Sequence, residues 1–117
     1  MINEKKLVEI AGKLLARTKE NEIQWQMTQN KGFPQEYVYK LPGSAIAIRY
    51  WSPEVEPDGY EFQLRGDRGQ VAAKLDAEEG SENFSLLKEL FLEAHRTESG
   101  WDQVLAEVEG FLNMAEK

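Results

Sequence analysis

The sequence predicts an α+β fold with an N-terminal helix, a five-stranded antiparallel meander over about residues 22–76, and two C-terminal helices packed on one face of the sheet. Two changes of hydrophobic period carry this prediction. Apolar residues recur at helical spacing up to about residue 20, alternate with polar residues through the middle of the chain, and return to helical spacing after about residue 81. Short connections between consecutive strands favour antiparallel pairing.

The first element is a helix over residues 4–20. Asn3 is a favourable N-cap, and Glu4 in the first turn interacts favourably with the positive end of the helix dipole. Charged residues fill most of one side of this helix, and the other side is apolar. The apolar stripe comprises Leu7, Ile10, Ala11, Leu14 and Leu15.

Five strands follow, each identified by the alternation of apolar and polar residues. In the first strand Ile23, Trp25 and Met27 alternate with polar side chains. The same alternation in the fourth strand directs Tyr60 and Phe62, like Trp25, toward the core. The later strands are expected over residues 37–41, 44–51, 60–65 and 71–75, with Val71, Ala73 and Leu75 on the inward side of the last one.

The segments between the strands have the chemistry of turns and loops. Gly and Pro interrupt residues 30–34, and two prolines keep residues 52–59 out of regular pairing. Pro42-Gly43 fits the central pair of a type II turn, because Pro fixes φ and Gly tolerates positive φ. The sequence Gly-Asp-Arg-Gly at 66–69 indicates a hairpin connection.

Two amphipathic helices complete the predicted fold. The first follows an acidic loop over residues 76–83, where Ser81 or Asn83 is the expected cap, and it ends at residues 97–100. Ser99 followed by Asp102 resembles a capping box for the last helix. We expect the wide stripe of this helix to pack within the monomer, with pairing to a second copy as the alternative. That stripe comprises Trp101, Val104, Leu105, Val108, Phe111, Leu112 and Ala115.

Length and composition favour a cytoplasmic, globular protein with one domain over residues 1–117. The formal net charge is −7, from 21 acidic and 14 basic residues. This charge argues against binding to nucleic acid or to an anionic membrane surface, and it permits a basic protein partner. The sequence has no cysteine, and no stretch approaches the roughly 20 apolar residues that span a bilayer. Disulfides and thiolate chemistry are therefore excluded.

The residues do not form a recognisable catalytic or metal-binding pattern. His95 is the only histidine and is expected to interact favourably with a helix C-terminus. The carboxylates of the loop at 76–83 lack the ligand spacing of a calcium-binding EF-hand. We expect no catalytic residue, no cofactor and no metal.

Aromatic side chains give the best candidates for a binding surface. Tyr37 and Tyr39 share a face of the second strand, and Arg49 and Trp51 share a face of the third. Exposed aromatic residues with Arg are typical of the residues that dominate interface energetics. The alternative is that a loop or helix covers them. With two aromatic residues of the last helix, the candidate interaction surface comprises Tyr37, Tyr39, Arg49, Trp51, Trp101 and Phe111.

Together these features favour a non-catalytic protein-interaction module that binds a protein partner or self-associates as a homodimer. The alternative is a small-molecule-binding protein or an enzyme that uses carboxylates and tyrosines in a cleft between sheet and helices. In size, acidity and mixed α+β pattern the chain resembles the acidic immunity proteins and antitoxins that neutralise basic toxins. It also resembles dimeric secretion chaperones, although these place a helix between strands that are consecutive here.

Overall fold

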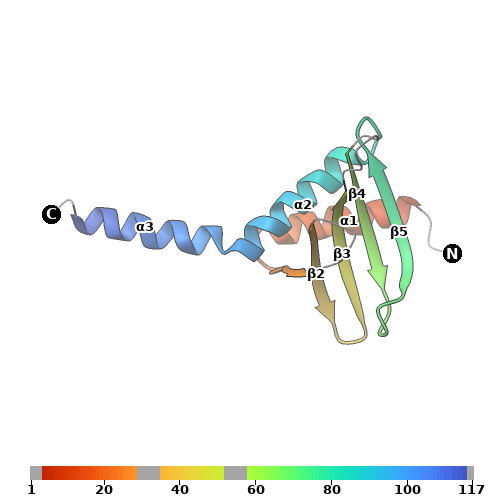
Figure 1. Cartoon of the computed structure of the whole chain (residues 1–117), viewed down its shortest axis with the longest axis horizontal. Coiled ribbons are helices and arrows are strands. Elements are labelled where there is room, and N and C mark those ends of the chain that lie inside the picture. The colour runs from red at the N-terminus through yellow and green to blue at the C-terminus, as the bar shows by residue number, and fades with distance from the viewer. Residues whose placement is uncertain (1–3, 29–34, 52–57, 116–117) are drawn as a thin grey trace.

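The computed structural model of the chain describes residues 4–28, 35–51 and 58–115. It confirms the predicted α+β class (Figure 1). The expected cap Asn3, the break at 30–34 and residues 52–57 of the expected loop lie outside the described residues. The elements are α1 (Glu4–Lys19), β1 (Gln26–Thr28), β2 (Gln35–Leu41), β3 (Ser44–Trp51), β4 (Gly59–Arg65), β5 (Val71–Glu78), α2 (Phe84–Ser99) and α3 (Trp101–Ala115).

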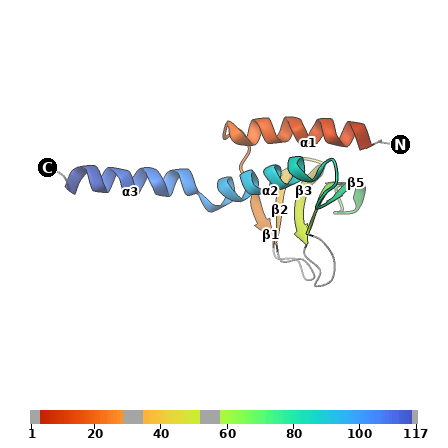
Figure 2. The same ribbon diagram turned by 90° about the horizontal axis from the view of Figure 1, so that it is seen from above.

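The sheet is a meander in which each strand pairs antiparallel with the next, in the order β1-β2-β3-β4-β5. The helices α1 and α2 lie side by side over one face of this sheet (Figures 1 and 2). Side chains alternate between the two faces of a strand. The covered face therefore receives one row of cross-strand neighbours, Tyr37, Ile48, Phe62 and Leu75.

The core lies between this face and the two helices. Trp25, Tyr60 and Phe62 are buried in it, as the alternation predicts, and Leu87 and Leu90 enter it from α2. Removing a side chain of this size from water contributes about 1.5–3 kcal/mol. Burial of large apolar side chains thus holds the sheet and the two helices together.

Two residues differ from their predicted inward positions. Met27 lies in β1, a three-residue strand at one edge of the sheet, and is 49% exposed. Val71 is also 49% exposed, because a register shift between Leu64 and Arg65 places Val71 opposite Arg65. The shift exchanges faces at that point. Leu75, beyond the shift, is buried as predicted.

The helix α3 makes the molecule elongated. It continues from the end of α2 in the helix layer and extends beyond the edge of the sheet (Figures 1 and 2). The molecule measures 61 × 37 × 27 Å, and its radius of gyration is 16.4 Å. A compact chain of this length has a radius of gyration of about 13 Å. The fold is therefore a compact body of sheet, α1 and α2 with α3 as a projecting arm.

Candidate functional site

Tyr37 and Tyr39 lie on the sheet face that α1 and α2 cover, and Tyr37 is fully buried in the core. The Tyr37 and Phe91 ring centroids are 5.1 Å apart, and a hydrogen bond of 2.5 Å joins the Tyr37 hydroxyl to Nδ1 of His95. Burial, and then the negative charge of Glu98, raise the pKa of Tyr37 above its ordinary value. Tyr37 is therefore a core residue that gives His95 a structural contact.

Arg49 lies on the opposite face of the sheet, in a buried ion cluster. Its Nε is 2.8 Å from the carboxylate of Glu36, whose side chain is only 2% exposed. Arg65 donates two hydrogen bonds of 3.0 Å to the same carboxylate, and the Thr28 hydroxyl donates one of 2.9 Å. Buried charges need such compensation. Arg49 thus ties β2 to β3 and is not on an exposed surface.

Of the three remaining candidates, Phe111 is exposed, and the side chains of Trp51 and Trp101 lie outside the described part of the structure. Phe111 belongs to a continuous apolar stripe on α3. The expectation that this stripe packs within the monomer is wrong, because its described members are between 38% and 69% exposed. Those members are Val104, Leu105, Val108, Phe111 and Leu112.

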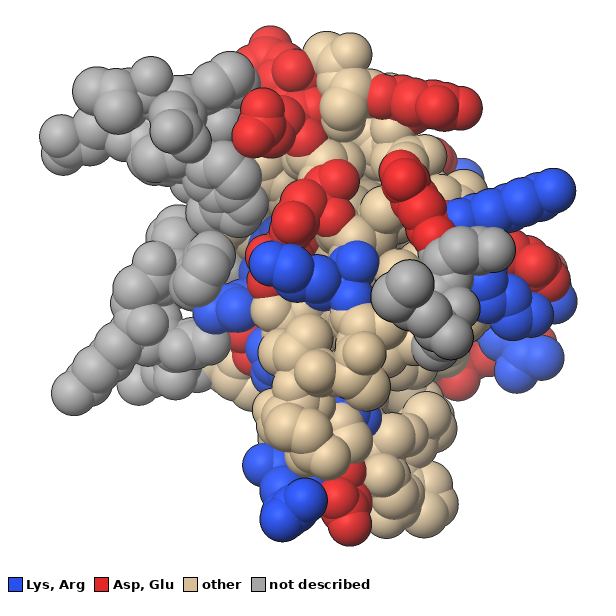
Figure 3. Space-filling view, turned by 90° about the vertical axis from the view of Figure 1, so that its right-hand side faces the viewer, with Lys and Arg blue, Asp and Glu red and all other residues tan. Residues whose placement is uncertain are grey.

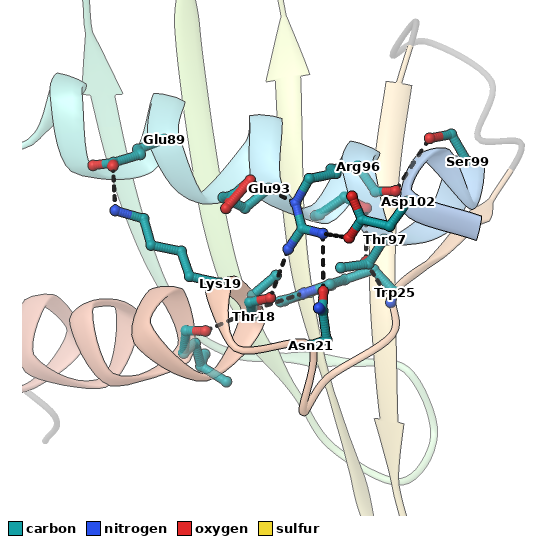
Figure 4. Close-up of polar contacts among 12 residues, drawn as sticks. Thr18, Lys19, Asn21, Trp25, Glu89, Glu93, Arg96, Thr97, Ser99 and Asp102 are labelled. Carbon is teal, nitrogen blue, oxygen red and sulfur yellow. Dashed lines mark hydrogen bonds and ion pairs between the residues drawn. The ribbon is translucent and has the colours of Figure 1, made fainter. Parts of the chain in front are cut away.

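The position of α3 is set at the junction where α1, α2 and α3 meet (Figure 4). Gly100 ends α2 in the left-handed conformation at φ 68°, which suits a residue without a Cβ. Asn21 ends α1 in the same conformation at φ 63°. Its N–H binds the Thr18 carbonyl at 3.0 Å, and the N–H of Glu22 binds the Arg17 carbonyl at 3.0 Å, the pattern of a Schellman motif. Both helix ends are therefore fixed locally.

Arg96 joins these two ends. From α2 its guanidinium donates to the Asn21 side chain at 2.8 Å, to the Thr18 carbonyl at 3.0 Å and to the Glu93 carboxylate at 3.0 Å. It also binds the carboxylate of Asp102, in the first turn of α3 (Figure 4). Asp102 thus contacts Arg96 and not Ser99, so the predicted capping box is wrong. A single guanidinium therefore holds the start of the arm against the ends of α1 and α2.

A second set of bonds supports the same junction. The Trp25 indole N–H donates to the Thr18 hydroxyl at 3.1 Å, and this hydroxyl donates to the Leu14 carbonyl at 2.7 Å. The backbone N–H of Trp25 donates to the Thr97 hydroxyl at 3.1 Å. Trp25 thereby links α1 to the end of α2, which makes the base of the arm part of the folded body.

The polar side of α3 carries charge of one sign. Asp102, Glu107 and Glu109 are its charged residues, and residues 101–115 contain no Lys or Arg. All the described side chains from 102 to 114 are exposed. The arm therefore presents an apolar stripe beside which all ionised side chains are carboxylates, and Arg96 binds one of these, Asp102. The sequence periodicity identified this stripe, but it did not indicate that the stripe is uncovered.

Two pockets of the described structure do not fit the alternative of a catalytic or small-molecule cleft. One of about 210 Å³ lies at the junction beside Asn21, Arg96 and Asp102, and it is smaller than the usual 300–1,000 Å³ of ligand sites. One of about 370 Å³ lies at the turns, where Arg65 already binds Glu36. Neither pocket combines a tyrosine with a carboxylate.

Over residues 4–28, 35–51 and 58–115, no three His, Asp or Glu side chains gather as metal ligands would. Within the same ranges, no helix has the length and apolar character needed to cross a bilayer. Comparisons of the chain with protein-family models, with curated proteins and with solved structures find no match.

Proposed function

We propose that this chain is a non-catalytic protein-interaction module, and that α3 binds an amphipathic helix of a partner protein whose flanking residues are basic. The observation that carries the proposal is the exposed apolar stripe of α3, positioned by Arg96 and accompanied by carboxylates only. Contiguous exposed apolar surface of this kind is typical of a binding site. A cytoplasmic location is part of the proposal, and a cysteine-free sequence is compatible with it.

The fixed junction supports a binding role for the arm. Arg96 uses its hydrogen bonds to hold the first turn of α3 in one orientation relative to α1 and α2. A binding helix that is already ordered loses less conformational entropy on association than a disordered segment does. An amphipathic partner helix would lie in the groove beside the stripe and contact residues three and four apart, such as Val104, Val108 and Phe111.

Charge decides the kind of partner. Two α3 helices placed side by side would bring Glu107 and Glu109 of both copies together, and neither helix has a Lys or Arg to compensate them. Like charges at an interface oppose association. A basic partner helix would instead pair with these carboxylates and would be steered toward a chain of net charge −7. A basic partner therefore fits α3 better than a second copy does.

The test uses two synthetic amphipathic peptides, one of Leu and Lys and one of Leu and Glu, and measures their affinity for the full chain by fluorescence anisotropy. We expect the Leu/Lys peptide to bind and the Leu/Glu peptide not to bind. Loss of one well-buried leucine costs roughly 1.5–3 kcal/mol, so Leu112→Ser should weaken binding about ten-fold or more. Added salt should weaken it further.

Leu92→Ser in α2 is the matched control, because Leu92 and Leu112 are both 52% exposed. It should leave the affinity unchanged. Wild-type affinity in both variants would show that the peptide binds acidic surface generally. A Leu/Lys peptide that does not bind the wild type would also contradict the proposal.

A further inference from the structure

The strand β5 ends the sheet on the side opposite β1 and has an open edge. It is eight residues long, and among the described residues it pairs with β4 alone. The helix α1 reaches past β5 in the helix layer, above the sheet and not alongside its edge (Figures 1 and 2). An edge strand of this length presents backbone N–H and C=O groups that another strand can bind.

Most features that protect an edge strand are absent from β5. Protected edges are typically short, contain Pro, carry charged side chains or a β-bulge, or place a charge on the buried face. The strand β5 contains no Pro, and the residues on its helix-covered face are Ala73, Leu75 and Ala77. Its central charges, Lys74 and Asp76, lie 3.7 Å apart on the other face, where their side chains are 58% and 49% exposed. The one irregularity is the register shift at the start of the strand, which leaves residues 73–78 regular.

We propose that β5 pairs antiparallel with β5 of a second copy of this chain, about a two-fold axis at Leu75, so that the two sheets form one continuous sheet. An axis normal to the sheet keeps the helices of both copies on the same face. In this register Lys74 lies opposite Asp76 of the second copy, and Asp76 lies opposite its Lys74. Ala73 and Ala77 face each other on the covered side. The arrangement is a closed, isologous dimer.

Charge selects this register from its neighbours. A two-fold axis normal to the sheet always passes between two identical residues, so the possible centres near the middle of β5 are Lys74, Leu75 and Asp76. A centre at Lys74 sets two ammonium groups opposite each other, and a centre at Asp76 sets two carboxylates opposite each other. Directly opposed like charges destabilise strand pairs, whereas opposite charges stabilise them. The centre at Leu75 alone avoids a pair of like charges and makes two pairs of opposite ones.

The charges on this side of the molecule are compatible with such pairing. Figure 3 looks at the β5 side and shows acidic and basic atoms interspersed with uncharged ones. The chain as a whole is acidic, and the ionised residues of α3 are all acidic. The β5 edge is therefore better suited than α3 to contact an identical chain. This pairing leaves α3 free and does not depend on the function proposed for it.

The first experiment is sedimentation velocity of the full chain over a wide concentration range. The wild type should form a dimer, and Lys74→Glu and Asp76→Lys should each weaken it at least ten-fold. Mixing these two variants should restore a dimer, because the introduced carboxylate of one then faces the introduced ammonium of the other. Lys88→Glu, the same charge change on exposed α2 surface, should leave the dimer intact.

The second experiment uses the wild type alone and therefore does not depend on how the variants fold. Amide hydrogen exchange over residues 73–77 should slow as the concentration rises through the dimerisation range. A strictly monomeric wild type, or a dimer without added protection in β5, would overturn the inference. So would two folded variants that do not associate when mixed. If Phe111→Ser abolishes the dimer, the second copy binds α3 and not β5, which would overturn the inference. The peptide experiment tests the surface of α3 separately.

Discussion

The helices α1 and α3 are similar in length and carry the same kind of apolar stripe, yet their surroundings differ completely. The stripe of α1 is buried against the sheet and α2, with Leu7 3% and Ala11 0% exposed. On α3, Phe111 is 69% and Leu112 52% exposed. The difference shows that amphipathic periodicity identifies a surface to be covered, whereas the topology decides whether the same chain covers it. A stripe left uncovered is where a partner is expected.

The largest expected effect comes from truncating one leucine in each helix. Leu7→Ala should lower the free energy of unfolding by about 2–5 kcal/mol, because it opens a cavity in the core. Leu112→Ala should change it by less than about 0.5 kcal/mol, because this side chain is half exposed. Urea unfolding followed by circular dichroism measures both. Similar losses in the two variants would mean that Leu112 packs against the body as Leu7 does, contrary to the exposure of α3.

A smaller effect is expected where body and arm meet. Arg96→Ala removes hydrogen bonds to Asn21, Thr18 and two carboxylates, and hydrogen bonds involving charged groups contribute about 1.5–3 kcal/mol. We expect a loss of about 1–3 kcal/mol in unfolding free energy, since the site is partly solvated. Amide exchange in α3 should accelerate at the same time. Arg17→Ala, on the exposed side of α1, is the control and should alter neither quantity.

How far the sequence predicts the fold is clear from α1, the meander and α2. Their periods are unambiguous, and the order of elements follows from the short turns. Alternation also separates Tyr37 and Arg49 onto opposite faces of the sheet. Alternation does not indicate which face of the sheet the helices cover. Tyr37 and Arg49 could therefore both be proposed as exposed.

The remaining features depend on register and on three-dimensional proximity. Glu36 meets Arg49 and Arg65 only when β2, β3 and β4 are aligned, and the register shift that displaces Val71 is a property of the strand pair. Arg96 reaches residues more than 70 positions away in the sequence. The sequence alone shows the charge of α3, because all of its ionised residues are acidic. Its exposure required the structure.

Alkaline pH should act on the body and not directly on the arm, because residues 101–115 contain no tyrosine. Burial raises the pKa of Tyr37 in the folded chain above its ordinary value of 10.0. The folded state therefore holds this proton more tightly. The resulting stability is present below about pH 10 and is lost as the pH rises through the folded-state pKa.

The variant Tyr37→Phe tests whether stability is lost in this direction of pH. At pH 7 the variant should be about 0.5–1.5 kcal/mol less stable, because it lacks the hydrogen bond to His95. Above about pH 10 the gap should narrow, with a slope of at most about 1.4 kcal/mol per pH unit. Urea titrations at a series of alkaline pH values measure it. Burial also raises the pKa of Tyr60, so the unfolding free energy of both wild type and variant keeps a residual dependence on pH. A gap that widens above pH 10 would contradict the prediction.

The smallest expected effect concerns the charged side of α1, which carries ions of both signs, unlike α3. On α1, Glu9 lies 3.1 Å from Lys13 and 3.8 Å from Lys6, and these cations lower the pKa of Glu9, with the hydrogen bond to Lys13 as the largest cause. Lys13→Gln should therefore raise that pKa toward its ordinary value of 4.5. Titration of the Glu9 carboxyl by NMR measures the change.

Salt should reduce the difference between wild type and variant, because both partners are exposed. The stability that depends on this pair is present above the ordinary pKa of Glu9 and is lost as the pH falls through its lowered value. A Glu9 pKa that does not respond to Lys13→Gln would show that the pair does not persist in solution. The polar side of α1 would then lack the internal charge compensation that distinguishes it from α3, where all ionised residues are acidic.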